Sequence, residues 1–294
     1  MRFLFVDRIL HLNPGQNIQG LKHVSYDDYY LTHDATGRLH FPTSLVGETL
    51  GQLAAWAVMH HNHFTKRPVA GIVSKASFSR AVYPGETLFL DSTIDDLSDE
   101  SVAYHSEGFV EDEKVFHIES ALGPMMPMDS LISEHAARQQ FEEIYHPGEF
   151  TVTDTEHSDV IRSDIQPYVQ FHYDHILAIE PGLSIKALKR VTRTAPWFPD
   201  HFPNKPVLPL TVLIESTMNL AREFLKHSEF GQVAFEPIEI RRVKMNEFVT
   251  PGDEVVTLLK VKRHDDETLV LSGRCEVHGK RVCVLEIFLA RRER

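Results

Sequence analysis

LFVDRILHLNPGQNIQGLKHVS, residues 4–25, has a second version in the chain, FHYDHILAIEPGLSIKALKRVT, at residues 171–192. At an offset of 167 residues, Asp, Ile, Leu, Pro, Gly, Ile, Leu, Lys and Val recur in register. Each copy predicts a strand, a Pro-Gly turn and a second strand.

Two further pairs of segments repeat in the same order. AVYPGETLFL (81–90) matches FVTPGDEVVT (248–257) at the same offset, and SEGFVEDEKVFHI (106–118) resembles SGRCEVHGKRVCV (272–284). The first pair predicts a turn that leads into an alternating strand, and the second predicts a hairpin with a polar turn. Ordered matches at one nearly fixed offset indicate a duplication.

Each half also contains one apolar helix between its first and second matched segments, at residues 44–59 and 211–226. The first is apolar almost all round, which predicts a buried helix. The expected fold class is α+β, with two antiparallel sheets that each wrap around a long buried helix. Joined edge to edge, the two sheets would cover each other's edge strands.

The repeat also divides the chain. We expect an N-terminal unit at residues 1–127, a linker at 128–164 and a C-terminal unit at 165–294. Within the linker, residues 130–145 have a helical composition and residues 146–159 are typical of a loop.

Composition narrows the class of protein. The 294 residues are 42% hydrophobic and 24% charged, which is ordinary for a globular protein, and the net charge of −12 argues against a general nucleic-acid binder. Cys275 and Cys283 are interpreted as reduced thiols on one strand. The N-terminus has too short an apolar run for a signal peptide, and no apolar segment reaches the roughly 20 residues of a membrane span. These features predict a cytoplasmic protein without a membrane span.

Residues 197–215, WFPDHFPNKPVLPLTVLIE, combine a histidine and a carboxylate. His201 lies in a proline-rich loop, and Glu215 lies in the apolar helix that follows. The repeat offset maps Glu215 onto Glu48. A lone Glu in an apolar helix is more often exposed or paired than catalytic, but two Glu at equivalent positions, each preceded by a His, favour a functional site.

The histidine of the first half has two candidates. LHFPTSL contains His40, but the offset aligns its proline with the helix-start proline of the second half. YYLTH (29–33) aligns instead with WFPDH (197–201), which makes His33 the expected counterpart of His201. We therefore interpret His40 as structural or solvated.

These segments resemble the 3-hydroxyacyl-[acyl-carrier-protein] dehydratases, a family of hotdog-fold enzymes. The family pattern PFFxGHFPGxPVxPGVLxxEALAQ is similar to PWFPDHFPNKPVLPLTVLIESTMN in the second half and, more weakly, to DYYLTHDATGRLHFPTSLVGETLGQL in the first. The resemblance covers nearly the whole chain apart from the linker. It implies a double hotdog with active sites between the two units.

Carried over by position, the resemblance implies that His201 faces Glu48 and that His33 faces Glu215. Gln52 follows Glu48 as in the family, so we expect the first pair to be the primary catalytic pair and the second to be a working or vestigial one. Substrate-binding positions are expected at Leu210, Thr211, Thr43, Gln52, Asn219, Phe202 and Pro209. Leu210 and Thr43 stand where the family has a glycine whose N–H approaches the thioester.

The implied reaction is reversible dehydration of a 3-hydroxyacyl thioester. A histidine can take the C2 proton, and a carboxylic acid on a buried helix can donate one to the departing hydroxyl. The resemblance implies acyl carrier protein or an acyl thioester as partner, with no cofactor and no metal, and leaves a homo-oligomer open. HHNH (60–63) is interpreted as a solvated helix end.

Two other functions stay open. A hotdog acyl thioesterase would act on the same class of substrate. A non-catalytic acyl-thioester binder, or a degenerate partner subunit, is suggested by the side chains of Leu210 and Thr43.

Overall fold

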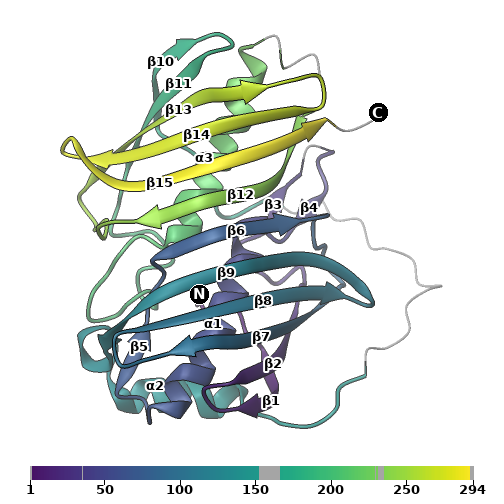
Figure 1. The fold of residues 1–294 in the computed structure, drawn as a ribbon, viewed down its shortest axis with the longest axis vertical. Helices are drawn as coiled ribbons and strands as arrows, with labels where there is room; N and C mark the ends of the chain where they lie inside the picture. The colour runs from purple at the N-terminus through teal and green to yellow at the C-terminus, as the bar shows by residue number, and fades with distance from the viewer. Residues whose placement is uncertain (1, 35, 152–165, 229, 231–234, 292–294) are drawn as a thin grey trace.

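The computed structural model describes residues 2–34, 36–151, 166–228, 230 and 235–291 (Figure 1). Its first half contains β1 (Arg8–Asn13), β2 (Asn17–His23), β3 (Thr32–His33), β4 (Leu39–His40), α1 (Thr43–His61), β5 (Lys66–Pro68), β6 (Ile72–Phe78), β7 (Thr87–Leu97), β8 (Ser101–Val110) and β9 (Glu113–Pro127). The second half contains β10 (His175–Glu180), β11 (Ser184–Arg190), α3 (Leu210–Lys226), β12 (Phe235–Met245), β13 (Glu254–His264), β14 (Thr268–Val277) and β15 (Lys280–Arg291).

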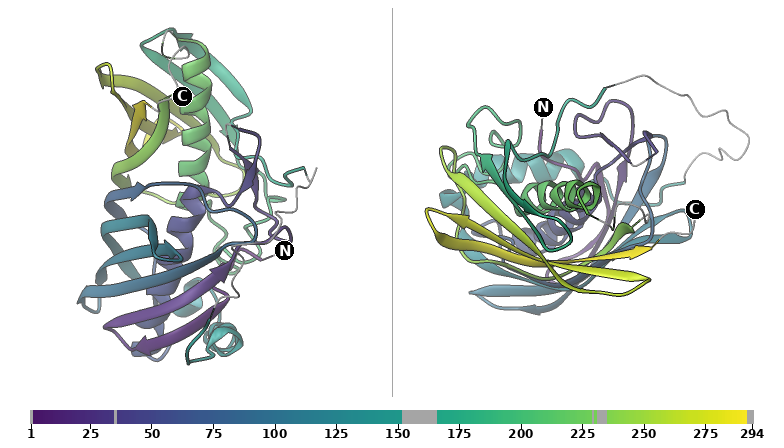
Figure 2. Two further views of the ribbon diagram at one scale, coloured as in Figure 1. Left: turned by 90° about the vertical axis from the view of Figure 1, so that its right-hand side faces the viewer. Right: turned by 90° about the horizontal axis from the view of Figure 1, so that it is seen from above.

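The long strands form one antiparallel sheet in the order β1-β2-β7-β8-β9-β6-β12-β15-β14-β13-β11-β10, and β5 pairs with β9 beside it. The order is mirrored about the pair β6–β12, where Ala76 lies opposite Ile240. Figure 2 shows α1 and α3 on the concave face of this curved sheet. The predicted α+β double hotdog, with two sheets joined edge to edge around two helices, is confirmed.

The duplication extends to backbone detail. Gly15 and Gly182, in the turns after β1 and β10, both have φ of +71°, a left-handed conformation that glycine adopts without a Cβ penalty. The strand pairs β1–β2 and β10–β11 also carry register shifts at equivalent places, Ile9/His11 and Ile176/Ala178. The same local backbone requirements explain why these residues match in the sequence.

The helices are held by one continuous core. Leu45, Leu50 and Leu53 of α1 and Val212 and Leu213 of α3 are all completely buried against it. Burying side chains of this size contributes about 1.5–3 kcal/mol each. The two helices also contact each other, and the first turn of each is hydrogen-bonded to the second turn of the other.

The segment after β9 is helical, as predicted. It forms the short helix η1 (Met128–Ser130) and α2 (Glu134–Ile144), whose N-cap Ser133 accepts a hydrogen bond from the backbone N–H of Ala136. Phe141 of α2 packs against Trp56 and Phe64, which anchors the segment on the first unit. Residues 152–159 of the predicted loop lie outside the described residues.

The cysteine interpretation needs a correction. Cys275 lies on β14 and Cys283 lies directly opposite on β15, so the two residues occupy neighbouring strands and not one. The turn at His278 and Gly279 reverses the chain between them, and both backbones have positive φ there. Both thiols are buried and free.

Among the described residues, no helix combines the length and the apolarity that a membrane crossing requires.

Candidate active site

A cavity of about 150 Å³ lies at the boundary between the two units. One face of α1 forms its floor, the strands β5, β6, β8 and β9 form one side, and the loop before α3 with the start of α3 forms the other. Glu48, Gln52, His201, Phe202, Leu210 and Thr211 all line it. The structure therefore brings together, at one place, six of the residues that the sequence singled out.

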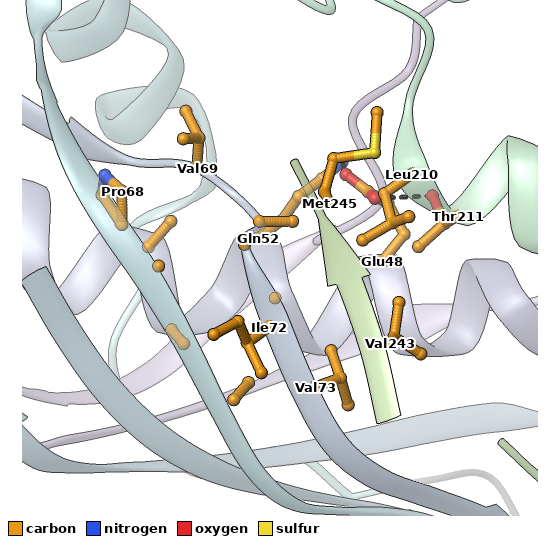
Figure 3. A pocket seen from close by; sticks show the side chains of 18 of the residues that line it. Glu48, Gln52, Pro68, Val69, Ile72, Val73, Leu210, Thr211, Val243 and Met245 are labelled. Atoms are coloured by element: carbon orange, nitrogen blue, oxygen red, sulfur yellow. Dashed lines mark hydrogen bonds between the residues drawn. The ribbon is translucent and has the colours of Figure 1, made fainter. Parts of the chain in front are cut away.

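Glu48 connects the two units within this cavity (Figure 3). Its Oε2 atom accepts a hydrogen bond of 2.7 Å from the hydroxyl of Thr211, the second residue of α3. Its Oε1 atom accepts one of 3.0 Å from Nε2 of Gln52, one helical turn further along α1. Two fixed donors thus set the orientation of the Glu48 carboxyl group before any ligand arrives.

Gln52 also fixes the N-terminal segment beneath the site. Its Oε1 accepts a 2.9 Å hydrogen bond from the backbone N–H of Phe5, and its Nε2 donates to the carbonyl of Phe3 at 3.2 Å. The N–H of Phe3 in turn donates a 2.8 Å hydrogen bond to the carboxylate of Asp200, the residue immediately before His201. This segment therefore links the helix that carries the carboxyl group to the loop that carries the histidine.

His201 is held on three sides. Its ring stacks on Phe202 with centroids 4.2 Å apart and meets the edge of Phe3 at 5.6 Å. Its Nδ1 donates to the carbonyl of Val207 at 3.3 Å, because a carbonyl can only accept, and this leaves Nε2 as the basic nitrogen. Burial lowers the pKa of His201 below its usual range, although the charge on Glu48 opposes this. The ring is therefore neutral near pH 7 and can accept a proton.

Two residues that sequence reasoning missed also line the cavity. Arg67 on β5 is 8% exposed, and Tyr104 on β8 lies beside α1, where its hydroxyl would be 3.3 Å from a Cβ added at Gly51. Burial raises the pKa of Tyr104, and the charge on Glu48 raises it further. Neither position stands out in the sequence, because only the packing of β5 and β8 against α1 makes them neighbours of Glu48.

The predicted ligand-contacting positions at the helix starts are placed by two prolines. Pro209 is the N-cap residue of α3 and Pro42 is that of α1, so Leu210 and Thr43 are the first helical residues. Leu210 is 7% exposed, and its side chain faces the cavity. The family's glycine position is therefore filled by a side chain here, while its backbone N–H remains.

The second predicted pair is arranged differently. Glu215 is 1% exposed, and its Oε2 accepts a 3.3 Å hydrogen bond from the backbone N–H of Ser44 in the first turn of α1. Its Oε1 lies 3.7 Å from Nη1 of Arg222, which also donates to Asn219 at 2.6 Å. The repeat places Arg222 where α1 has Ala55, a residue that lines the first cavity. A guanidinium thus occupies the space that is open in the first site.

The histidine near Glu215 is His40 and not His33. His33 is exposed on β3, whereas His40 is 5% exposed on β4, and its Nδ1 donates to the carbonyl of Phe41 at 2.9 Å. Burial lowers the pKa of His40, and the charge on Glu215 opposes this. The expected pairing of His33 with Glu215 is corrected, because neighbouring positions in the small β3–β4 hairpin face opposite ways.

Within the described residues, no group of three metal-binding side chains gathers closely enough to hold an ion. The HHNH segment ends α1, with Asn62 as the C-cap residue. His60 packs on Phe141 with ring centroids 5.0 Å apart, and burial lowers its pKa. This histidine is part of the contact with α2 and is more enclosed than the predicted solvated end.

The fold defines a double-hotdog protein. A family model described as a FabA-like domain matches residues 1–119 and 167–286, and the chain belongs to this family. A 3-hydroxyacyl-[acyl-carrier-protein] dehydratase FabZ from Oenococcus oeni is 36% identical over 112 residues, which are 38% of this chain and 81% of that protein.

Solved structures show the same fold over almost the whole chain. The dehydratase domain of PpsC from Mycobacterium tuberculosis, in complex with C12:1-CoA, has a TM-score of 0.56 at 12% identity and covers 98% of each chain. An acyl-ACP thioesterase from Bacteroides thetaiotaomicron has a TM-score of 0.54 at 10% identity, covering 93% of this chain and 97% of that one. At these identities the likeness concerns the fold.

Proposed function

We propose that the protein dehydrates 3-hydroxyacyl thioesters reversibly, through one active site formed by His201 and Glu48. The observation that carries this proposal is the contact that Glu48 makes between the two units. The carboxyl group of one unit is bonded to Thr211 of the other, and both line the cavity that also contains His201. A base and an acid from different units thus face one space.

The chemistry assigns one proton to each group. Nε2 of His201 takes the proton from C2 of the substrate, while Glu48 gives its proton to the hydroxyl on C3, which leaves as water. The electron pair of the broken C2–H bond forms the C2–C3 double bond of the enoyl product. Thr211 and Gln52 stabilise the Glu48 carboxylate that results, because both donate to its oxygens.

The thioester oxygen gains negative charge during this step and needs donors. The first N–H groups of a helix have no partner within it, and the helix dipole is positive at that end. The start of α3 at Leu210 lies at the cavity, so its N–H groups are suited to this oxygen. The substrate is proposed to arrive on acyl carrier protein, as the name of the Oenococcus oeni relative indicates for that protein.

The second arrangement is proposed to be vestigial. Glu215 is enclosed and already bonded to Ser44 and Arg222, and Arg222 fills the position of Ala55. An acyl chain would have to displace a charged side chain to reach it. The repeat has therefore kept the carboxylate while closing the site.

The test is turnover of the purified protein with 3-hydroxyacyl and 2-enoyl thioesters of several chain lengths, followed by the absorbance of the enoyl group. We expect the enoyl band to form from the hydroxy substrate, and His201→Ala to lower kcat by about 10²- to 10⁴-fold. Release of free thiol without an enoyl product would indicate a thioesterase. Binding without either product would indicate a non-catalytic binder, and both results would refute the proposal.

A further inference from the structure

Arg67 is an unusual side chain for a cavity wall. It lies in the middle of β5, is 8% exposed and lines the same cavity as Glu48 and His201. Its Nε atom is shielded from solvent and has no hydrogen-bond partner. Throughout residues 2–34, 36–151, 166–228, 230 and 235–291, no side chain or carbonyl accepts a hydrogen bond from its guanidinium or forms an ion pair with it.

The guanidinium is nevertheless charged at neutral pH. Burial lowers the pKa of Arg67 to about 10, and the charge on Glu48 opposes this effect. The ring of Phe202 lies 4.7 Å from the Cζ atom and offers a cation–π contact. A ring face stabilises the charge but accepts no conventional hydrogen bond, so the buried Nε–H of the guanidinium stays unsatisfied.

Glu48 does not serve as the partner of Arg67. Its two oxygens are already bonded to Gln52 and Thr211, and it forms no ion pair with Arg67. The carboxyl group of Glu48 is therefore held by neutral donors, and the buried Arg67 has no carboxylate partner among the described residues. An unpaired buried charge is costly, which favours a function that supplies its missing partner.

The surroundings of Arg67 limit what that partner can be. Pro68, Val69 and Ile72 form the neighbouring wall and offer apolar side chains (Figure 3). An ordinary alkyl chain would fit such a wall but would leave the buried Nε–H of Arg67 without an acceptor. A carboxylate matches the planar fork of the guanidinium with two parallel hydrogen bonds.

We propose that Arg67 binds a carboxylate carried by the acyl chain of the substrate, so that the cavity selects acyl thioesters with a second acidic group. This inference rests on the proposed function for the identity of the ligand as an acyl thioester. The thioester oxygen itself is assigned to the N–H groups at the start of α3. Arg67 is therefore a specificity-determining residue; it transfers no proton itself, but, together with burial, its charge helps to lower the pKa of His201.

The first experiment measures binding without turnover. Adipoyl- and hexanoyl-pantetheine, with an amide in place of the thioester, are matched in length and differ in a terminal carboxylate. Calorimetry on the full chain is expected to show about 10- to 100-fold tighter binding of the adipoyl analogue. Arg67→Met should remove this difference, and Arg67→Lys should keep part of it. Suberoyl and octanoyl analogues repeat the comparison for a longer chain.

Arg138 provides the matched control. Its Cζ atom also lies 4.7 Å from an aromatic ring, that of Phe64, but it lies on α2 and does not line the cavity. Arg138→Met should leave the preference for the carboxylate unchanged. Thermal unfolding of each variant shows whether it is folded. If Arg67→Met fails to fold, Arg67→Lys, which keeps the positive charge, takes its place in the comparison.

Two results would overturn the inference. Equal binding of the acidic and alkyl analogues by the wild type would show that Arg67 does not select for a carboxylate. If Arg67→Met weakens the binding of both analogues equally, the guanidinium contacts the part of the ligand that they share.

The two proposals can fail separately. Turnover of alkyl enoyl thioesters without any carboxylate preference would refute the role of Arg67 and leave the dehydratase intact. A carboxylate preference in binding, without turnover of any acyl thioester, would support the role of Arg67 and refute the dehydratase.

Discussion

Thr211→Val removes the one hydroxyl through which α3 holds the carboxyl group of Glu48. The bond is short, 2.7 Å, and it joins the two units. A hydrogen bond to a charged group contributes about 1.5–3 kcal/mol, and Glu48 becomes a carboxylate as it gives up its proton. If the proposed reaction makes this bond in its transition state, the loss of the bond lowers kcat/KM by about 10- to 100-fold.

The assay is the initial rate of enoyl formation or loss, with two matched variants. Thr49→Val removes a buried hydroxyl next to Glu48 that bonds only the carbonyl of Leu45 at 2.7 Å and lies outside the cavity. This variant should stay within about threefold of wild type, because that carbonyl keeps its helical partner. Thr211→Ser keeps a hydroxyl and should recover most of the rate. A fully active Thr211→Val, or an equal loss in Thr49→Val, would show that the hydrogen bond from Thr211 does not assist the reaction.

Three further predictions concern Gln52, the pair of Arg222 with Glu215, and the pH dependence of His201. Gln52→Leu should lower the free energy of unfolding by about 2–4 kcal/mol, measured by denaturant titration, because it leaves buried backbone groups unpaired; an unchanged midpoint would contradict this. Arg222→Ala should lower the free energy of unfolding by about 1–2 kcal/mol, because it leaves the buried Glu215 without its ion-pair partner. The loss is limited because the arginine side chain is 36% exposed and water partly screens the pair. Adding Glu215→Gln should recover part of that loss, and strict additivity would argue against the pairing. The acid limb of the pH profile of kcat/KM should have its midpoint below pH 6.5, because burial lowers the pKa of His201 and the base accepts a proton only when it is neutral. A midpoint above pH 6.5 would contradict this.

The same lowered pKa has a consequence for stability. The unfolded chain binds a proton at His201 at a higher pH than the folded chain, so the unfolded state holds more protons in the window below pH 6.5. The contribution of His201 to stability is therefore lost as the pH falls through that window.

The architecture could be predicted because the two copies obey the same backbone requirements. The turns at Gly15 and Gly182 have the same φ, and the strand irregularities at Ile9 and Ile176 lie at equivalent positions. Such features restrict which residues can stand there, so the copies stayed recognisable at one offset. The start of each helix was predictable for the same reason.

The partner of Glu215 could not be predicted in the same way. The first-half loop forms the small hairpin β3–β4, in which His33 pairs with Leu39 and Thr32 pairs with His40. Side chains alternate between faces in a strand, so one residue of shift decides which histidine turns inward. Alignment with the second half favoured His33, because that half has no equivalent hairpin among the described residues.

The two arginines near the glutamates, Arg222 and Arg67, differ in how far the sequence alone could have indicated them. Arg222 lies seven residues after Glu215, on the same face of α3, so helical periodicity alone could have indicated it. Arg67 gave no such signal. It becomes a neighbour of Phe202 only when β5 of one unit packs against the loop of the other.

A single active site formed by His201 and Glu48 can be tested by the enoyl absorbance assay on Glu48→Gln beside Glu215→Gln. The two substitutions are chemically identical and occupy equivalent positions of the repeat. We expect Glu48→Gln to lose nearly all activity and Glu215→Gln to keep most of it. Equal losses, or a loss confined to Glu215→Gln, would contradict a single site formed by His201 and Glu48.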